Sequence, residues 1–145
     1  NIIFIFSMKS FFATNSDIGL ALLRIGVGAM MLPFGLMKLG FIAGQGSGIE
    51  ATVGFMTGAG IPALVAWLVI IGESLGALSL ILGFFTRFCA ASLGVIMIGA
   101  IYMMFGSGYF AGYQSMLLFL LVFVVLVING GGAWSVDAAM AKKVK

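Results

Sequence analysis

Charged side chains are scarce in this sequence. Only 8% of its 145 residues are Asp, Glu, Lys or Arg, whereas soluble domains carry roughly 25%. Because 63% of the residues are hydrophobic, there is too little polar surface to cover a water-soluble globule. We therefore predict an integral membrane protein that contacts the lipid bilayer, and one domain at this length.

Histidine is absent and cysteine occurs once. A haem b site normally needs His, and a zinc or iron–sulfur site needs several His or Cys ligands, so these sites are excluded within this chain alone. A single Cys also excludes an internal disulfide. The net charge of +3 is small and no basic run precedes the C-terminal tail, so nucleic acid is not an expected partner. We predict no cofactor bound covalently or through metal ligands.

Four apolar segments approach the roughly 20 residues that a membrane-spanning helix needs. They cover residues 18–39, 62–84, 87–105 and 113–128. We therefore predict an all-α fold, a bundle of four transmembrane helices within a membrane domain at 18–130. Residues 1–17 form an N-terminal segment, of which 1–7 precede Met8 and are either upstream sequence or an addition, and residues 131–145 form a basic tail.

Positive charges near the ends of the spans predict the orientation. Four spans place both termini on one side, and that side gathers Lys9, Arg87 and the lysines of the tail, whereas the opposite side holds Lys38. We therefore expect both termini in the cytoplasm and the long connection, residues 40–61, on the outer side.

The connections between the spans differ in length. Residues 84–86 form a very short hinge, which makes the second and third spans antiparallel neighbours. Within the long connection, Ile49, Val53 and Met56 recur at helical spacing, so either a short interfacial helix or a Gly-rich loop is expected there.

One carboxylate, Glu73, lies in the middle of the apolar second span. Insertion scales assign a charged side chain at this depth a cost of roughly 2.5–3.5 kcal/mol, which a partner, a proton or water must offset. Arg24, in the first span, is the predicted partner in a buried polar pair, because Arg keeps its charge and can grip a carboxylate with two parallel bonds. The alternatives are that Arg24 extends to the headgroups while Glu73 stays protonated, or that a cavity filled with water or ligand surrounds the carboxylate.

Small residues recur at helical spacing around this point. Gly72 and Gly76 flank Glu73, and Gly28 and Gly35 lie seven apart in the first span. Because small residues let helices approach closely in lipid, we predict that these glycines pack helices together. Lys38 is expected to extend toward the outer headgroups. Three charged residues are candidates for contacts with a ligand or partner: Lys38, Arg87 and Asp137.

Several of these residues stand in a recognisable order. The stretches "LLRIGVGAMMLPFGLMKLGF", "GIPALVAWLVIIGESLGALSLILGFFTRFCAASLGVIM" and "GGGAWSVDAAM" together resemble the DoxX family of small four-helix bacterial membrane proteins, from about Ile18 to Met140. The resemblance is carried by the Arg of the first span, the later Gly-x-x-Lys, the Glu of the second span, the Gly-Phe-Phe-Thr-Arg hinge and the closing Trp-Ser-x-Asp. Members of the family commonly carry His-Gly-x-x-Lys, whereas this chain has Phe34 before Gly35.

The resemblance implies a multi-pass protein of the bacterial inner membrane, associated with a membrane redox system. Relatives include a small subunit of thiosulfate:quinone oxidoreductase and a component of a membrane-linked oxidative-stress complex. The first hypothesis is therefore an accessory or structural subunit that contacts other membrane subunits, with quinone as a possible ligand and no activity implied for the isolated chain. The alternative is a small proton-coupled transporter that uses Glu73.

Overall fold

The computed structural model describes residues 16–44, 47–105 and 110–143, and these residues form helices and no strands. Four long helices correspond to the four predicted spans. Their bounds, which differ from the predicted ones by a few residues, are α2 (Ser16–Leu39), α4 (Ala63–Leu82), α5 (Thr86–Phe105) and α6 (Phe110–Asn129).

Two short helices complete the described fold. The long connection contains α3 (Ile49–Gly58), which confirms a short helix over a plain Gly-rich loop. The predicted tail contains α7 (Val136–Lys143), a helix that was not predicted from the sequence. Most of the predicted N-terminal segment, together with residues 106–109 between α5 and α6, lies outside the described residues.

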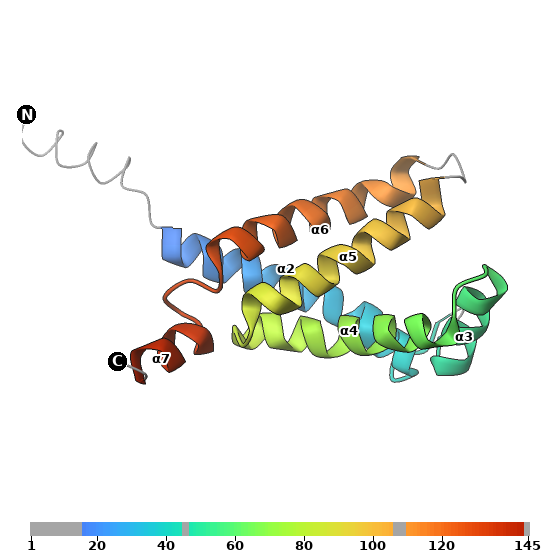
Figure 1. Ribbon diagram of the computed structural model, residues 1–145, viewed down its shortest axis with the longest axis horizontal. Coiled ribbons are helices and arrows are strands. Elements are labelled where there is room, and N and C mark those ends of the chain that lie inside the picture. The colour runs from blue at the N-terminus through green and yellow to red at the C-terminus, as the bar shows by residue number, and fades with distance from the viewer. Residues whose placement is uncertain (1–15, 45–46, 106–109, 144–145) are drawn as a thin grey trace, which may run out of the picture.

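The long helices pack chiefly as two antiparallel pairs, α2 with α4 and α5 with α6, and α4 also contacts α5 (Figure 1). The α4–α5 connection is as tight as predicted. Gly83 ends α4 in the left-handed conformation (φ 74°), and Phe85 also has a positive φ of 47°. Figure 1 places α7 beside this connection, at the opposite end of the bundle from α3. We call the end with α7 the hinge end; it comprises residues 83–87 and 130–138.

Glycines determine the axial register of α2 against α4. A Cβ added at Gly35 would lie 2.8 Å from the backbone Cα and N of Ser74, and one at Gly28 would lie 2.9 Å from the carbonyl oxygen of Ala77. Cβ atoms do not approach backbone this closely, so both glycines allow α2 to pack directly against the backbone of α4. Residues near position 35 of α2 therefore lie level with residues near position 74 of α4.

The glycines of α4 face the other neighbour, α5. A Cβ at Gly72 would lie 2.9 Å from Cδ1 of Ile96, and one at Gly76 would lie 3.3 Å from the side chain of Leu93. Both glycines therefore lie where α4 packs against side chains of α5. The buried apolar core lies between all four long helices; it comprises Val27, Met31, Ala77, Leu80, Ala90, Leu93, Met97, Phe123 and Leu126.

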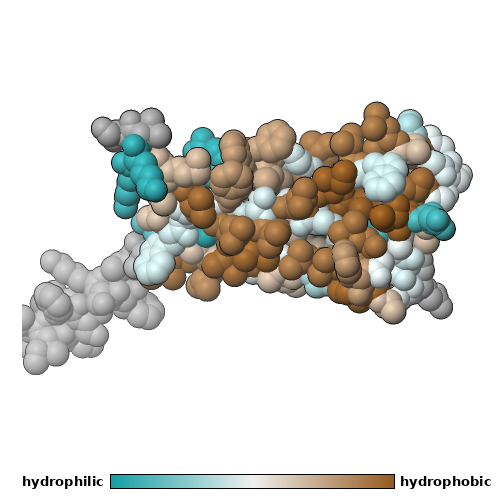
Figure 2. Space-filling view, turned by 90° about the horizontal axis from the view of Figure 1, so that it is seen from below, coloured by the Kyte–Doolittle hydropathy of each residue, from teal (hydrophilic) through white to brown (hydrophobic). Residues whose placement is uncertain are grey.

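The outer surface of the bundle is apolar. Helices α2, α4 and α5 are long and apolar enough to cross a membrane, and residues 113–129 of α6 form a shorter apolar helix. Large hydrophobic side chains such as Leu64, Phe88 and Val95 are exposed. On the face drawn in Figure 2, hydrophobic residues cover the middle and hydrophilic ones gather toward the ends. This distribution is that of a helical membrane bundle, because in lipid the apolar side chains face outward.

Candidate functional site: two polar clusters in the bundle

Glu73 lies in the middle of α4 and is buried, with 3% of its surface exposed. Its Oε1 accepts a hydrogen bond of 2.5 Å from Nζ of Lys38, in the last turn of α2. The Lys38 side chain is 26% exposed, so this ion pair reaches from the interior toward the bundle surface. The second oxygen, Oε2, is buried and has no hydrogen-bond partner in the described part of the chain.

Arg24 occupies a different place in the bundle. Its side chain is among the most buried in the protein, with 1% exposed. Nη1 donates to the carbonyl oxygens of Leu80 and Ile81, at 2.6 and 2.9 Å, and Nη2 donates to the carbonyl oxygen of Trp134 at 2.9 Å. The carbonyl groups of a helix's last turn lack partners within that helix. Arg24 therefore satisfies the end of α4 and ties it to the C-terminal segment.

The predicted pair between Arg24 and Glu73 is wrong. The prediction placed the two residues at similar depths by counting from the ends of their spans. In the structure α2 extends beyond the end of α4, and Arg24 lies beside Gly83. At about 1.5 Å per residue, Gly83 is about 15 Å along α4 from Glu73. The expectations that Arg24 or Lys38 would extend to the headgroups are also wrong, since Arg24 is enclosed and Lys38 binds the carboxylate.

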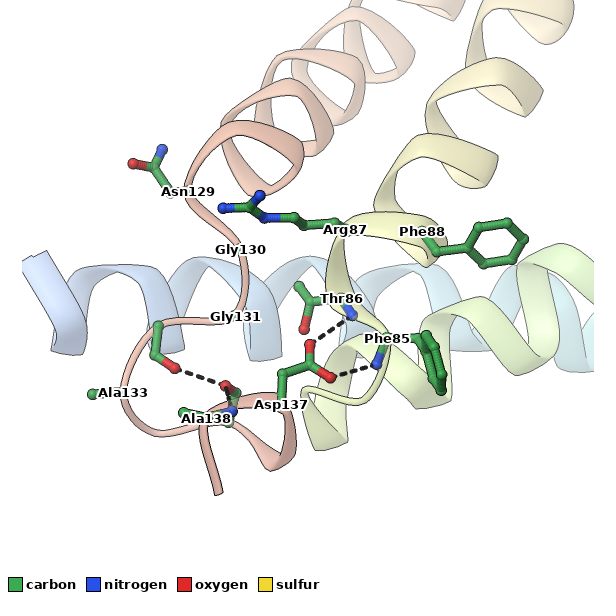
Figure 3. A pocket seen from close by; sticks show the side chains of 12 residues that line it. Phe85, Thr86, Arg87, Phe88, Asn129, Gly130, Gly131, Ala133, Asp137 and Ala138 are labelled. Carbon is green, nitrogen blue, oxygen red and sulfur yellow. Dashed lines mark hydrogen bonds between the residues drawn. The ribbon is translucent and has the colours of Figure 1, made fainter. Parts of the chain in front are cut away.

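Asp137 connects the tail to the start of α5. Its two carboxylate oxygens accept hydrogen bonds of 2.8 Å from the backbone N–H groups of Phe85 and Thr86 (Figure 3), and its own N–H donates to the carbonyl of Gly83. A carboxylate at this position satisfies free N–H groups and complements the positive end of the helix dipole. Asp137 therefore caps α5 from a distant part of the sequence.

The rest of the closing motif serves the same junction. The hydroxyl of Ser135 accepts a hydrogen bond from the N–H of Ala138 and so caps α7. A Cβ at Gly131 would lie 2.7 Å from Oγ1 of Thr86, and one at Gly83 would clash with the guanidinium of Arg24. The Gly-Phe-Phe-Thr-Arg hinge, the closing Trp-Ser-x-Asp motif and Arg24 are widely separated in sequence and thus meet in one junction at the hinge end.

Arg87 lies beside this junction but outside its buried part. It lines an open groove of about 570 Å³ formed by the start of α5, the loop after α6 and the start of α7. Its Nη2 donates to the carbonyl of Ile128 at 3.3 Å. In Figure 3 its guanidinium extends toward Asn129 and Gly130, away from Phe88.

Three parts of these clusters were not predicted from the sequence: the carbonyl of Trp134, the capping hydroxyl of Ser135, and Lys38 as the partner of Glu73. The Ser135 cap had a signal, because Ser before a helical stretch is a preferred cap. The carbonyl of Trp134 had none, since a main-chain acceptor is the same for every residue type. Among the described residues, no three His, Cys, Asp or Glu side chains are grouped as a metal site would require.

Comparison with known proteins gives the family of this chain. Residues 19–107, more than half of the chain, match the sequence profile of the DoxX family. The chain is 29% identical over 133 residues to the inner membrane protein YqjF of Escherichia coli strain K12; the match covers 88% of this chain and 95% of YqjF. No solved structure matches it. With its apolar helices, these matches identify a multi-pass protein of the bacterial inner membrane. The chain belongs to the DoxX family.

Proposed function

We propose that this protein is an accessory, structural subunit of a membrane redox system and holds no redox centre of its own. The observation that carries the structural part is the use of Arg24. A buried guanidinium is expensive in a membrane and often marks a functional site. Here, however, it donates to main-chain carbonyls of α4 and of the C-terminal segment. Arg24 thereby fixes α2, the end of α4 and the C-terminal segment relative to one another. A subunit that partners recognise by its shape needs such a fixed arrangement.

The redox part of the proposal rests on the family. Electrons would have to come from a partner, because the sequence contains no His and one Cys and so lacks the ligands for a haem b, zinc or iron–sulfur centre. If a quinone binds, the Lys38–Glu73 pair is the favoured contact. The ammonium group of Lys38 can donate a hydrogen bond to a quinone carbonyl oxygen, and the Lys38 side chain extends toward the bundle surface.

The transporter alternative is less favoured by the geometry. A proton-coupled transporter needs a carboxylate that exchanges its proton readily during the cycle. Glu73 is buried and paired with the ammonium group of Lys38, so in this arrangement its carboxylate serves a contact between α4 and α2.

Gentle extraction from native membranes tests the proposal. A tagged full-length chain is purified in mild detergent, and co-purifying proteins and quinone are identified by mass spectrometry. We expect a redox enzyme subunit in fixed ratio. If quinone is also retained, it should be lost with Lys38→Gln and kept with Lys143→Gln, which removes a positive charge far from Glu73.

Two results would contradict the proposal. One is turnover of thiosulfate with quinone by the isolated chain. The other is proton-coupled uptake of a cation in proteoliposomes that contain this chain alone.

A further inference from the structure

A second surface feature continues the groove at Arg87. An apolar cleft of about 200 Å³ runs between α5 and α6. It is lined by small residues of α5, including Ala91 and Gly94, and by branched residues of α6, including Val124 and Ile128. The cleft faces outward where the bundle surface is apolar, since Ala91, Val124 and Ile128 are all exposed.

The groove and the cleft follow one line on the surface. Arg87, Ala91, Gly94 and Ile98 are spaced by three or four residues, so they lie on one face of α5. Across the seam, Ile128 lines the cleft, and its carbonyl accepts the hydrogen bond from Arg87. The guanidinium therefore lies at the hinge end of the cleft, where the apolar wall gives way to polar residues.

Arg87 gives the groove a cation that can bind an anion. It lines the groove and is exposed. Of the acidic residues at the hinge end, Asp137 accepts from the start of α5 and Asp17 accepts from the N–H of Ala133. Both carboxylates face backbone N–H groups, whereas Arg87 donates one long hydrogen bond to a carbonyl and is otherwise exposed, so its guanidinium is the charged donor of the groove that remains open to a ligand.

We propose that this seam binds one anionic phospholipid, with its headgroup phosphate at Arg87 and one acyl chain in the α5–α6 cleft. Arg binds phosphate with paired hydrogen bonds, and basic pockets between transmembrane helices recognise anionic headgroups. A neutral ligand would leave the guanidinium of Arg87 without an anionic partner, and a free anion would leave the apolar cleft unused. A phospholipid fits both parts in the order in which they occur. The site is separate from the Lys38–Glu73 pair.

Native mass spectrometry of the full-length chain, delipidated in detergent and titrated with defined lipids, tests the proposal. Phosphatidylglycerol should bind more tightly than phosphatidylcholine, a comparison that needs no variant. Arg87→Gln should weaken phosphatidylglycerol binding about tenfold, the effect of losing a charge-assisted hydrogen bond. Ala91→Leu, which fills the cleft from its exposed side, should weaken binding of both lipids.

Two matched variants serve as controls. Lys143→Gln removes a charge at the same end but outside the groove, and Ala29→Leu enlarges an exposed alanine on α2; neither should change the binding. Equal affinity for the two lipids would overturn the proposal. So would inorganic phosphate displacing the lipid while Ala91→Leu has no effect, because the groove would then be a plain anion site. Occupation of the cleft by a second copy of the chain or by quinone, either one abolished by Ala91→Leu, would overturn it too.

Discussion

Double-mutant cycles distinguish the observed ion pair of Lys38 and Glu73 from the pair that the sequence suggested. The two singles, Lys38→Met and Glu73→Gln, and their combination measure the coupling between these side chains. A parallel cycle with Arg24→Gln and Glu73→Gln measures the coupling that sequence reasoning expected. The structure predicts strong coupling in the first cycle and none in the second.

The two single changes should differ in cost. Removing one partner of a buried pair costs about 3–5 kcal/mol, because the remaining charge is left without compensation. Lys38→Met leaves the carboxylate of Glu73, 3% exposed, without its partner, so a loss in this range is expected. Glu73→Gln leaves Lys38, whose side chain is already 26% exposed, free to extend outward, and we expect about 1–2 kcal/mol.

The free energy of unfolding of each variant can be measured by circular dichroism in mixed micelles with increasing SDS. The double change at Lys38 and Glu73 should cost less than the sum of the singles by about 1–3 kcal/mol. Arg24 and Glu73 lie about 15 Å apart along the helix, so their losses should add within about 0.5 kcal/mol. Additive losses for Lys38 and Glu73, or coupling between Arg24 and Glu73, would refute this account of the bundle.

Three further predictions concern packing, capping and topology. Gly35→Ala should destabilise the bundle by about 1–3 kcal/mol because its Cβ meets α4 backbone, whereas Gly26→Ala, with nothing within 4 Å, should be neutral or stabilising in the same unfolding assay. Asp137→Ala should cost about 0.5–2 kcal/mol because it removes the cap of α5. Amide hydrogen exchange at the start of α5 should be faster in this variant than in the unchanged protein, and Asp137→Asn, which keeps an acceptor oxygen, should restore the slower exchange. Equal exchange there in all three proteins would argue against the cap. The distribution of positive charges predicts that both termini are cytoplasmic, so a cysteine at Ser47 but not one at Lys145 should react with an impermeant thiol reagent in intact cells of a Cys-free background. The reverse labelling pattern would show the opposite orientation.

The local features of the fold could be predicted from sequence because each depends on nearby residues. The apolar segments have the length and composition of spanning helices, and the hinge is too short for anything but antiparallel neighbours. The glycines around Glu73 and in α2 indicate close helix contacts, because a residue without a Cβ lets two helices approach this closely. The apolar spacing of Ile49, Val53 and Met56 left a short helix and a Gly-rich loop both open, and the structure forms the helix α3.

The sequence by itself determined that this chain is a helical membrane protein with polar residues buried in its bundle. The tertiary structure decided which partner each of them has. Partners depend on how far antiparallel helices slide past each other, and each added residue moves a side chain about 1.5 Å along the axis. The contacts of Gly28 and Gly35 set this register, placing Glu73 within reach of Lys38 and Arg24 level with Gly83. The contact between Asp137 and the start of α5 is also decided by the tertiary structure. The position of Asp137 depends on the fold of the loop after α6, which no local sequence pattern predicts.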